Sequence, residues 1–153
     1  MSLNTEASTP GFLVWRLSMK WRMAVDRALA PLGLTHARYS LLASLLSMEQ
    51  SGEQPSQSQL AESTGLEPLY ISRLARALED DGLVQRDPHP ADSRAVQLSM
   101  TDSGRETIAS AVDNVHVLLD ELLAPLGGLG AERTEVFTRQ VAILLDVPLR
   151  PPT

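Results

Sequence analysis

Four arginines in the central part of the chain have the side chains best suited to recognising a nucleic acid: Arg73, Arg76, Arg86 and Arg94. The planar guanidinium group donates paired hydrogen bonds that match a guanine edge or a phosphate. On a helix, Arg73 can form a bidentate pair with a guanine, worth ~1–3 kcal/mol of discrimination between bases. Arg76, one turn later, is better placed to contact a phosphate. These residues therefore suggest recognition of bases and of the sugar-phosphate backbone.

Two short helices around a tight turn at residues 64–66 are predicted to position the first two of these arginines. Ser56 and the glutamine three residues later fit a capping box, in which each side chain bonds a free backbone N–H group at the helix start. This first helix is expected to end near Gly65. The second is predicted over residues 68–81, because a proline is tolerated at the start of a helix and Gly82 is placed to end it.

The helix predicted over residues 68–81 is amphipathic and is the candidate reader of base edges. Its inward-facing residues are Ile71, Leu74 and Leu78. A helix that reads DNA contacts bases through its first turns, where Leu69 and Tyr70 are placed to touch thymine methyl groups or a sugar edge. The candidate DNA contacts on this helix are Pro68, Leu69, Tyr70, Ser72, Arg73 and Arg76. Such residues on an isolated helix would be an ordinary solvated face, but the turn before them and the strands after them favour DNA.

A β-hairpin is predicted after this helix, from strand-like runs at residues 83–86 and 96–100. The segment between them, DPHPADSR, contains too many prolines for a two-residue turn and should form an extended tip. Arg86, on the first strand, is a further candidate phosphate contact. A helix-turn-helix followed by a hairpin is a winged helix, a shape suited to a DNA groove with a flap on the adjacent backbone.

Longer apolar helices are predicted on both sides of this segment. One starts at Thr9 and Pro10 and carries apolar residues at spacings of three and four. Another carries a seam from Ile108 to Leu122. The expected fold class is mostly α with a small β-hairpin wing: a winged helix-turn-helix plus N- and C-terminal dimerisation helices. The expected single domain of residues 1–153 comprises a DNA-binding lobe over residues 35–101 and dimerisation helices over residues 10–31 and 102–147. Alternatively, these helices pack only within the monomer.

Four segments resemble one known family when their order and spacing are taken together: GLTHARYSLLASLL, QLAESTGL, YISRLARALEDDGLV and ADSRAVQLSMTDSGRE. Each is a weak signal alone, but as a set they resemble the MarR family of bacterial transcriptional regulators over most of residues 12–145. The resemblance implies a homodimer that binds a pseudo-palindromic operator in double-stranded DNA. It also implies a repressor that is relieved by a small-molecule effector.

The hairpin tip contains Asp92-Ser93-Arg94, which matches the Asp-x-Arg motif of the family's wing. By resemblance, Arg94 reaches a minor groove or its phosphates, and Asp92 fixes the geometry of the hairpin. The alternative is a loop ion pair, worth ~0–1 kcal/mol when exposed. His89 departs from the basic residue often found near this tip.

The family resemblance also implies a small aromatic or phenolic effector between the dimerisation helices and the DNA-binding lobe. The candidate ligand-binding residues are Trp15, Met19, Met23, His36 and Arg38. The aromatic and methionine side chains would surround an apolar ring, and Arg38 would hold a carboxylate. The alternative is that the tryptophan and the methionines belong to the hydrophobic core.

The charge balance opposes DNA binding at first sight, because phosphates require cations and the chain has a net charge of −6. Residues 56–105 contain five arginines and eight acids, a balance of −3. A DNA-binding surface therefore requires the arginines to lie on one face and the acids elsewhere. The alternative function is a winged-helix module that binds protein and does not bind DNA.

Other function classes have little support in the sequence. The chain has no cysteine, and its three histidines, His36, His89 and His116, fall on different predicted elements, so no metal site or cofactor is expected. No catalytic constellation is present that would indicate an enzyme. No apolar run approaches the ~20 residues of a membrane-spanning helix, and a cytoplasmic protein is expected.

Overall fold

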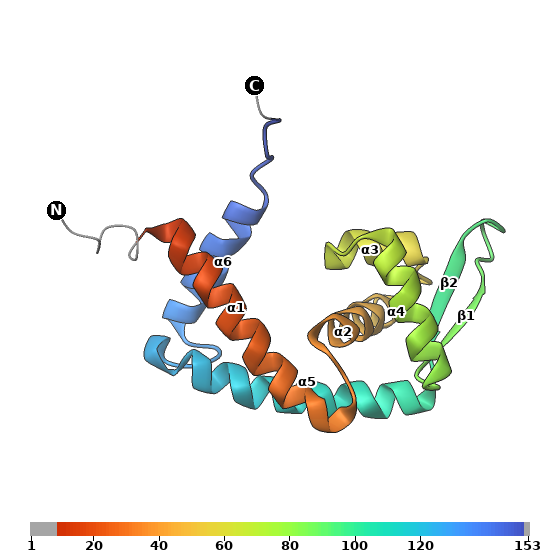
Figure 1. Cartoon of the computed structure of the whole chain (residues 1–153), viewed down its shortest axis with the longest axis horizontal. Coiled ribbons are helices and arrows are strands. Elements are labelled where there is room, and N and C mark those ends of the chain that lie inside the picture. Colours follow the sequence, from red (N-terminus) through yellow and green to blue (C-terminus); the bar gives the residue numbers. More distant parts are fainter. Residues whose placement is uncertain (1–8, 152–153) are drawn as a thin grey trace. The chain divides into compact units, whose positions relative to one another are not determined.

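The computed structural model describes residues 9–151, and the remaining ends of the expected 1–153 domain lie outside the described residues. Its helices and strands, labelled in Figure 1, are α1 (Pro10–Leu29), η1 (Ala30–Leu32), α2 (His36–Gln50), α3 (Gln57–Thr64), α4 (Pro68–Asp80), β1 (Val84–Pro88), β2 (Val96–Met100), α5 (Asp102–Leu122), η2 (Ala124–Leu126) and α6 (Glu132–Leu145). The mostly α class with one hairpin is confirmed. The chain divides into two compact units, one up to Val115 and one from His116. Among residues 9–151, no helix is both long and apolar enough to cross a membrane.

Helix α3 begins at its predicted cap, and helix α2 follows its N-cap residue Thr35. The Thr35 side chain accepts a hydrogen bond from the Arg38 backbone N–H at 3.3 Å. At α3 the capping box is complete: the Gln59 N–H donates to Ser56 Oγ at 3.2 Å, and the Ser56 N–H donates to Gln59 Oε1 at 2.8 Å. Gly65 then ends α3 with a φ of 72°, a left-handed conformation that favours glycine.

Helix α4 is fixed in place by its buried face and by its C-terminal turn. Its buried residues are Ile71, Leu74, Ala75 and Leu78. The helix ends at Asp80, one residue earlier than predicted, because Asp81 and Gly82 form the closing turn. The Leu83 N–H donates to the Leu78 carbonyl at 2.9 Å, which satisfies a carbonyl that the helix leaves free.

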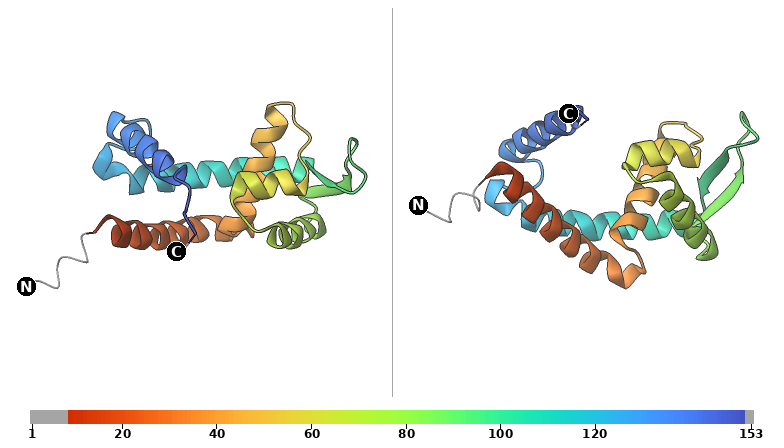
Figure 2. Two further views of the ribbon diagram at one scale, coloured as in Figure 1. Left: turned by 90° about the horizontal axis from the view of Figure 1, so that it is seen from above. Right: turned by 45° about the horizontal axis from the view of Figure 1, so that its top comes forward.

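The hairpin differs slightly from the prediction. Strand β1 starts one residue later, because Leu83 belongs to the turn after α4, and it continues to Pro88, which pairs with Val96. The two strands are antiparallel. The Leu98 N–H donates to the Pro55 carbonyl at 3.1 Å, so the segment before α3 attaches to β2. The hairpin projects from the group of α2, α3 and α4 in both views of Figure 2.

The core of the unit up to Val115 joins these elements. Its largest fully buried side chains include Leu41, Leu42 and Leu45 of α2, whereas Leu46 is partly exposed. Helix α5 contributes Gly104, Ile108, Ala111 and Val115. Thr101 caps α5, accepting from the Gly104 N–H at 3.0 Å and donating to the Gly82 carbonyl at 2.6 Å. The start of α5 is thereby tied to the turn that ends α4.

Helices α1 and α6 each expose large apolar side chains in the single chain. On α1 they are Phe12, Leu13, Val14, Trp15, Leu17, Met19 and Met23. On α6 they are Val136, Val141, Ile143, Leu144 and Leu145. The dimerisation role of these helices stays a prediction, and their exposed faces are consistent with it, because contiguous apolar surface commonly marks a protein interface.

Candidate nucleic-acid interface

The predicted contact residues of α4 lie mostly on its solvent-exposed side. Leu69 is 68% exposed and Tyr70 41% exposed. Pro68, Arg73 and Arg76 are exposed, and Ser72 is half-buried. Within residues 9–151, neither Arg73 nor Arg76 forms an ion pair or a side-chain hydrogen bond. Both guanidinium groups are therefore available to a ligand.

The acidic residues near the end of α4 are paired with arginines from other elements. Asp81 Oδ2 lies 3.2 Å from Arg38 Nη1 of α2. Glu79 Oε1 lies 3.8 Å from Arg86 Nη1 of β1, and Glu79 Oε2 accepts from the Arg86 backbone N–H at 3.0 Å. These partly exposed pairs contribute little stability. These pairs neutralise two acids of the lobe. Within residues 9–151, Arg73 and Arg76 of α4 have no acidic partner.

The Arg86 side chain contacts residues of α3 and α4 in the same chain. Its guanidinium group also donates from Nε to Gln57 Oε1 of α3 at 3.3 Å, and its side chain is 21% exposed. These contacts connect the hairpin to α3 and to the end of α4. Arg86 is thus better suited to fixing the wing than to contacting phosphate, and its DNA contact stays a prediction.

The wing tip presents Arg94 to solvent and uses Asp92 as a turn residue. The Arg94 side chain is 93% exposed. Asp92 Oδ1 accepts from the Arg94 backbone N–H at 3.0 Å, and the Asp92 carbonyl accepts from the Ala95 N–H at 3.0 Å. Arg94 Nε also lies 3.7 Å from Asp92 Oδ1, which is the loop ion pair of the alternative interpretation. Asp92 thus orders the backbone that carries Arg94.

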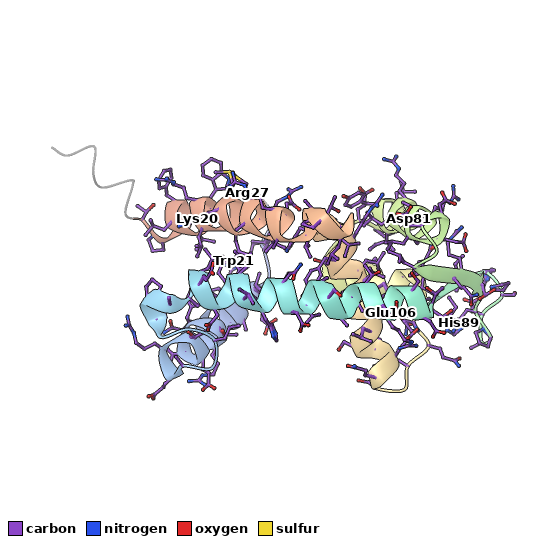
Figure 3. All side chains as sticks on the ribbon, turned by 90° about the horizontal axis from the view of Figure 1, so that it is seen from below. Lys20, Trp21, Arg27, Asp81, His89 and Glu106 are labelled. Carbon is purple, nitrogen blue, oxygen red and sulfur yellow. The ribbon has the colours of Figure 1, made fainter. Side chains whose placement is uncertain are left out.

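Sequence reasoning missed two groups that position the wing. Glu49, near the end of α2, accepts from the Met100 N–H at 2.9 Å and from Arg105 Nη2 at 2.8 Å, joining α2 to β2 and α5. His89, labelled on the hairpin in Figure 3, contacts the loop between α2 and α3. Neither residue has a local signal of this role, because each partner is distant in the sequence or lies in a loop.

A cavity of about 240 Å³ lies beside α4 and contains only part of the predicted ligand set. It is lined by Arg22, His36, Ala37, Ser40, Thr64, Leu66 and Tyr70. Of the five predicted residues, only His36 is among them. Trp15, Met19 and Met23 are exposed on α1, and Arg38 is occupied by Asp81 and by the Gly33 carbonyl at 3.5 Å.

The position of His36 in this cavity follows from a contact between α1 and α2. The His36 backbone N–H donates to Asp26 Oδ1 of α1 at 2.7 Å. A carboxylate is favourable at a helix N-terminus, where backbone N–H groups are free. This bond holds the start of α2 against α1, so that side chains from both helices face the same cavity.

Comparisons with known proteins identify the family. The MarR family model matches residues 34–96. The HTH-type transcriptional regulator YdcH of Bacillus subtilis, itself uncharacterised, is 36% identical over 109 residues, which are 71% of this chain and 74% of that protein. The transcriptional repressor CouR bound to a 23-mer DNA duplex superimposes with a TM-score of 0.81 at 25% identity, over 95% of this chain and 98% of that chain. CouR from Rhodococcus jostii RHA1 bound to p-coumaroyl-CoA superimposes with a TM-score of 0.77 at 27% identity, over 97% of this chain and 99% of that chain. This chain therefore belongs to the MarR family of winged helix-turn-helix transcriptional regulators.

Proposed function

We propose that the chain is a dimeric repressor that binds a pseudo-palindromic operator through α4 and the wing and releases it when a small effector binds. The observation that carries this proposal is the segregation of charge in the lobe. Among the described residues, Arg73 and Arg76 are exposed and form no ion pair, and Arg94 is exposed at the wing tip. Glu79 and Asp81, at the end of α4, are each paired with an arginine of another element. An acidic chain thereby offers cations to DNA, and its family consists of transcriptional regulators rather than enzymes.

The arginines of α4 and of the wing tip are each assigned one DNA contact. Arg73 pairs with a guanine edge in the major groove, and Arg76 contacts a phosphate. Leu69 and Tyr70, both exposed at the first turn of α4, contact thymine methyl groups or a sugar. Arg94 enters the adjacent minor groove, where a narrow groove has an enhanced negative potential. The operator half-site therefore combines a guanine with neighbouring thymines.

A homodimer is needed to place two such surfaces on one duplex, because one reader helix contacts only a few base pairs. Helix α1 and helix α6 each expose apolar side chains, which are proposed to contact the partner protomer. Dimers of this kind bind two half-sites about one helical turn apart. The proposal extends to this chain what the family resemblance implies for residues 10–31 and 102–147.

The cavity beside α4 is the proposed effector site. Its volume of about 240 Å³ suits a single aromatic ring with one polar group. Arg22 is a better candidate for a carboxylate partner than Arg38, because Arg38 already pairs with Asp81. Tyr70 lines the cavity and is also exposed on α4, so a ligand there contacts the reader helix directly. An effector releases DNA if it binds the non-binding geometry more tightly.

Gel-shift measurements with the duplex upstream of the chain's own gene test the DNA-binding proposal. The wild type should shift this duplex at low salt, and Arg73→Ala should lose sequence preference. Arg150→Ala, which removes the same charge from an exposed residue outside the helices and strands, is the matched control and should bind like the wild type. Failure of the wild type to bind at low salt would favour the protein-binding alternative.

Thermal-shift measurements with benzoate, 4-hydroxybenzoate and phenol test the effector site. At least one of these should raise the melting temperature of the wild type, because a ligand that binds only the folded state stabilises it. Arg22→Ala should abolish the response to the acids, whereas Arg38→Ala should keep it. The reverse pattern would assign the carboxylate to Arg38.

A further inference from the structure

The His89 ring bridges the wing tip and the loop between α2 and α3. Its Nε2 atom lies 2.9 Å from the Gln54 carbonyl oxygen, 35 residues earlier in the chain. Its Nδ1 atom accepts a hydrogen bond from the Ala91 backbone N–H at 3.1 Å. The His89 N–H also donates to the Ala95 carbonyl at 3.0 Å, which closes the tip. Figure 3 places this residue on the hairpin. One ring thus connects the tip backbone to the body of the lobe.

The two partners together determine the protonation state of the ring. A carbonyl oxygen can only accept, so Nε2 must carry a hydrogen. A backbone N–H can only donate, so Nδ1 must be a free acceptor. Only the neutral ring with its proton on Nε2 satisfies both partners. A second proton on Nδ1 would place two donors against each other. The charged ring therefore keeps its contact with Gln54 and loses its contact with Ala91.

The ring has room to move, and two carboxylates line the same cleft. His89 lines an open cleft of about 500 Å³ under the hairpin. The loop before α3 contributes Glu53 to this cleft, and the tip contributes Asp92. Ser56, the N-cap of α3, and Gln59 of α3 also line the cleft and are uncharged. A carboxylate can accept a hydrogen bond from a ring N–H that has lost its place against Ala91.

We propose that His89 is a positioning residue of the wing and that its protonation frees the Ala91 segment of the tip, which leads to Arg94, while the contact with Gln54 is kept. The inference rests on the proposed DNA-binding function, because its consequence is a change in operator affinity. The form that makes both contacts holds one proton fewer than the form that has lost the Ala91 contact, so acid favours the loosened tip. The loosened segment must be ordered again when DNA binds, which weakens binding. The change corresponds to one neutral hydrogen bond, or about two- to tenfold in affinity per protomer.

The bridge itself is tested on the protein without DNA. Imidazole ¹⁵N chemical shifts should identify the Nε2–H tautomer at about pH 8. Hydrogen exchange should show the Ala91 amide protected at about pH 8 and much less protected at about pH 5.5. His89→Ala should leave this amide unprotected at both values. An Ala91 amide whose protection is the same in wild type and His89→Ala would overturn the proposal.

Operator affinity as a function of pH tests the consequence, with the duplex upstream of the chain's own gene as the probe. The wild type should weaken about two- to tenfold per protomer between about pH 8 and about pH 5.5. His89→Ala should bind like the acid form at both values. His89→Gln, whose amide offers one donor and one acceptor but does not titrate, should remove the same pH dependence. His116→Gln, which replaces an exposed histidine of α5, should show the same pH dependence of operator binding as the wild type.

Two outcomes would overturn the inference at this stage. In the first, His89→Ala keeps the wild-type pH dependence. In the second, acid strengthens wild-type binding through His89, which would make the imidazolium a phosphate contact. If the wild type binds no duplex at any pH, the proposed function fails, and the Ala91 amide experiment still decides whether the bridge exists.

Discussion

Substitution of Gly104 by alanine should destabilise the protein, although glycine-to-alanine changes within helices usually stabilise. Gly104 lies in the first turn of α5 and is buried. A Cβ atom added there would press against the Leu83 backbone carbonyl and lie 2.9 Å from Met100 Sδ. The Met100 side chain can rotate away. The Leu83 carbonyl cannot move freely, because it accepts a hydrogen bond from the Thr101 N–H at 3.1 Å in the turn between α4 and the wing.

The two opposing effects differ in size. Replacing glycine by alanine in a helix interior gains up to ~1 kcal/mol of helix propensity. Overpacking a close contact costs about 1–3 kcal/mol, and more where a backbone atom must shift. The clash should therefore dominate, with a net loss of roughly 1–3 kcal/mol. For a chain of this size, that loss lowers the melting temperature by about 2–12 °C.

Thermal and urea denaturation of Gly104→Ala and the wild type at equal protomer concentration measure this effect, since dimerisation makes stability depend on concentration. Gly11→Ala is the matched control, because Gly11 lies in α1 and no described atom lies within 4 Å of an added Cβ. The control should be neutral or slightly stabilised. A Gly104→Ala protein as stable as the wild type would refute the proposed close packing of α5 on the turn after α4.

Three further predictions concern single side chains. Arg76→Ala should reduce the salt slope of operator binding by about 0.9 per protomer without changing sequence preference, as titrations of binding against salt would show. Arg86→Ala should lower the free energy of unfolding by about 0.5–1.5 kcal/mol, because Glu79 and Gln57 lose their partner, while the salt slope stays the same. A reduced slope would instead make Arg86 a phosphate contact. Burial raises the pKa of Tyr39, so the neutral phenol is favoured by folding. This contribution is complete below pH ~10 and is lost as pH rises through the raised pKa. Urea titrations at alkaline pH should show a shallower loss of stability in Tyr39→Phe than in the wild type.

The sequence predicted the helices well because their signals are local. The caps at Thr35 and Ser56 and the left-handed glycines at Gly65 and Gly82 are determined by residues three or four positions away. The exposed face of α4 followed from the period of its apolar residues. For the same reason, the helix bounds near this site differ from the prediction by a single residue.

The contacts that arrange charge around the site were not predictable from local patterns. Arg38 and Asp81 are 43 residues apart, and Arg105 and Glu49 are 56 residues apart. Arg38 was the predicted carboxylate partner, but it pairs with Asp81, and the arginine that lines the cavity beside α4 is Arg22. Only the packing of the helices decides which arginine is free.

The hairpin bounds were missed for a related reason. Leu83 has the composition of a strand residue, but its N–H bonds the Leu78 carbonyl and so belongs to the turn after α4. Asp87 and Pro88 are poor strand residues by composition, yet they pair with Gln97 and Val96. Pairing across the hairpin overrides the intrinsic preference of these residues.

The salt dependence of duplex binding by the wild-type chain tests the central claim most directly. If Arg76 contacts one phosphate and Arg94, in the minor groove, neutralises the charge of one more, each dimer neutralises four phosphates and the logarithmic slope is about −3.6. Affinity should then fall by about 150-fold over a fourfold rise in salt concentration. A duplex affinity that does not change with salt, or no binding at low salt, would contradict the proposal that this acidic chain gathers its free cations on one DNA-binding surface.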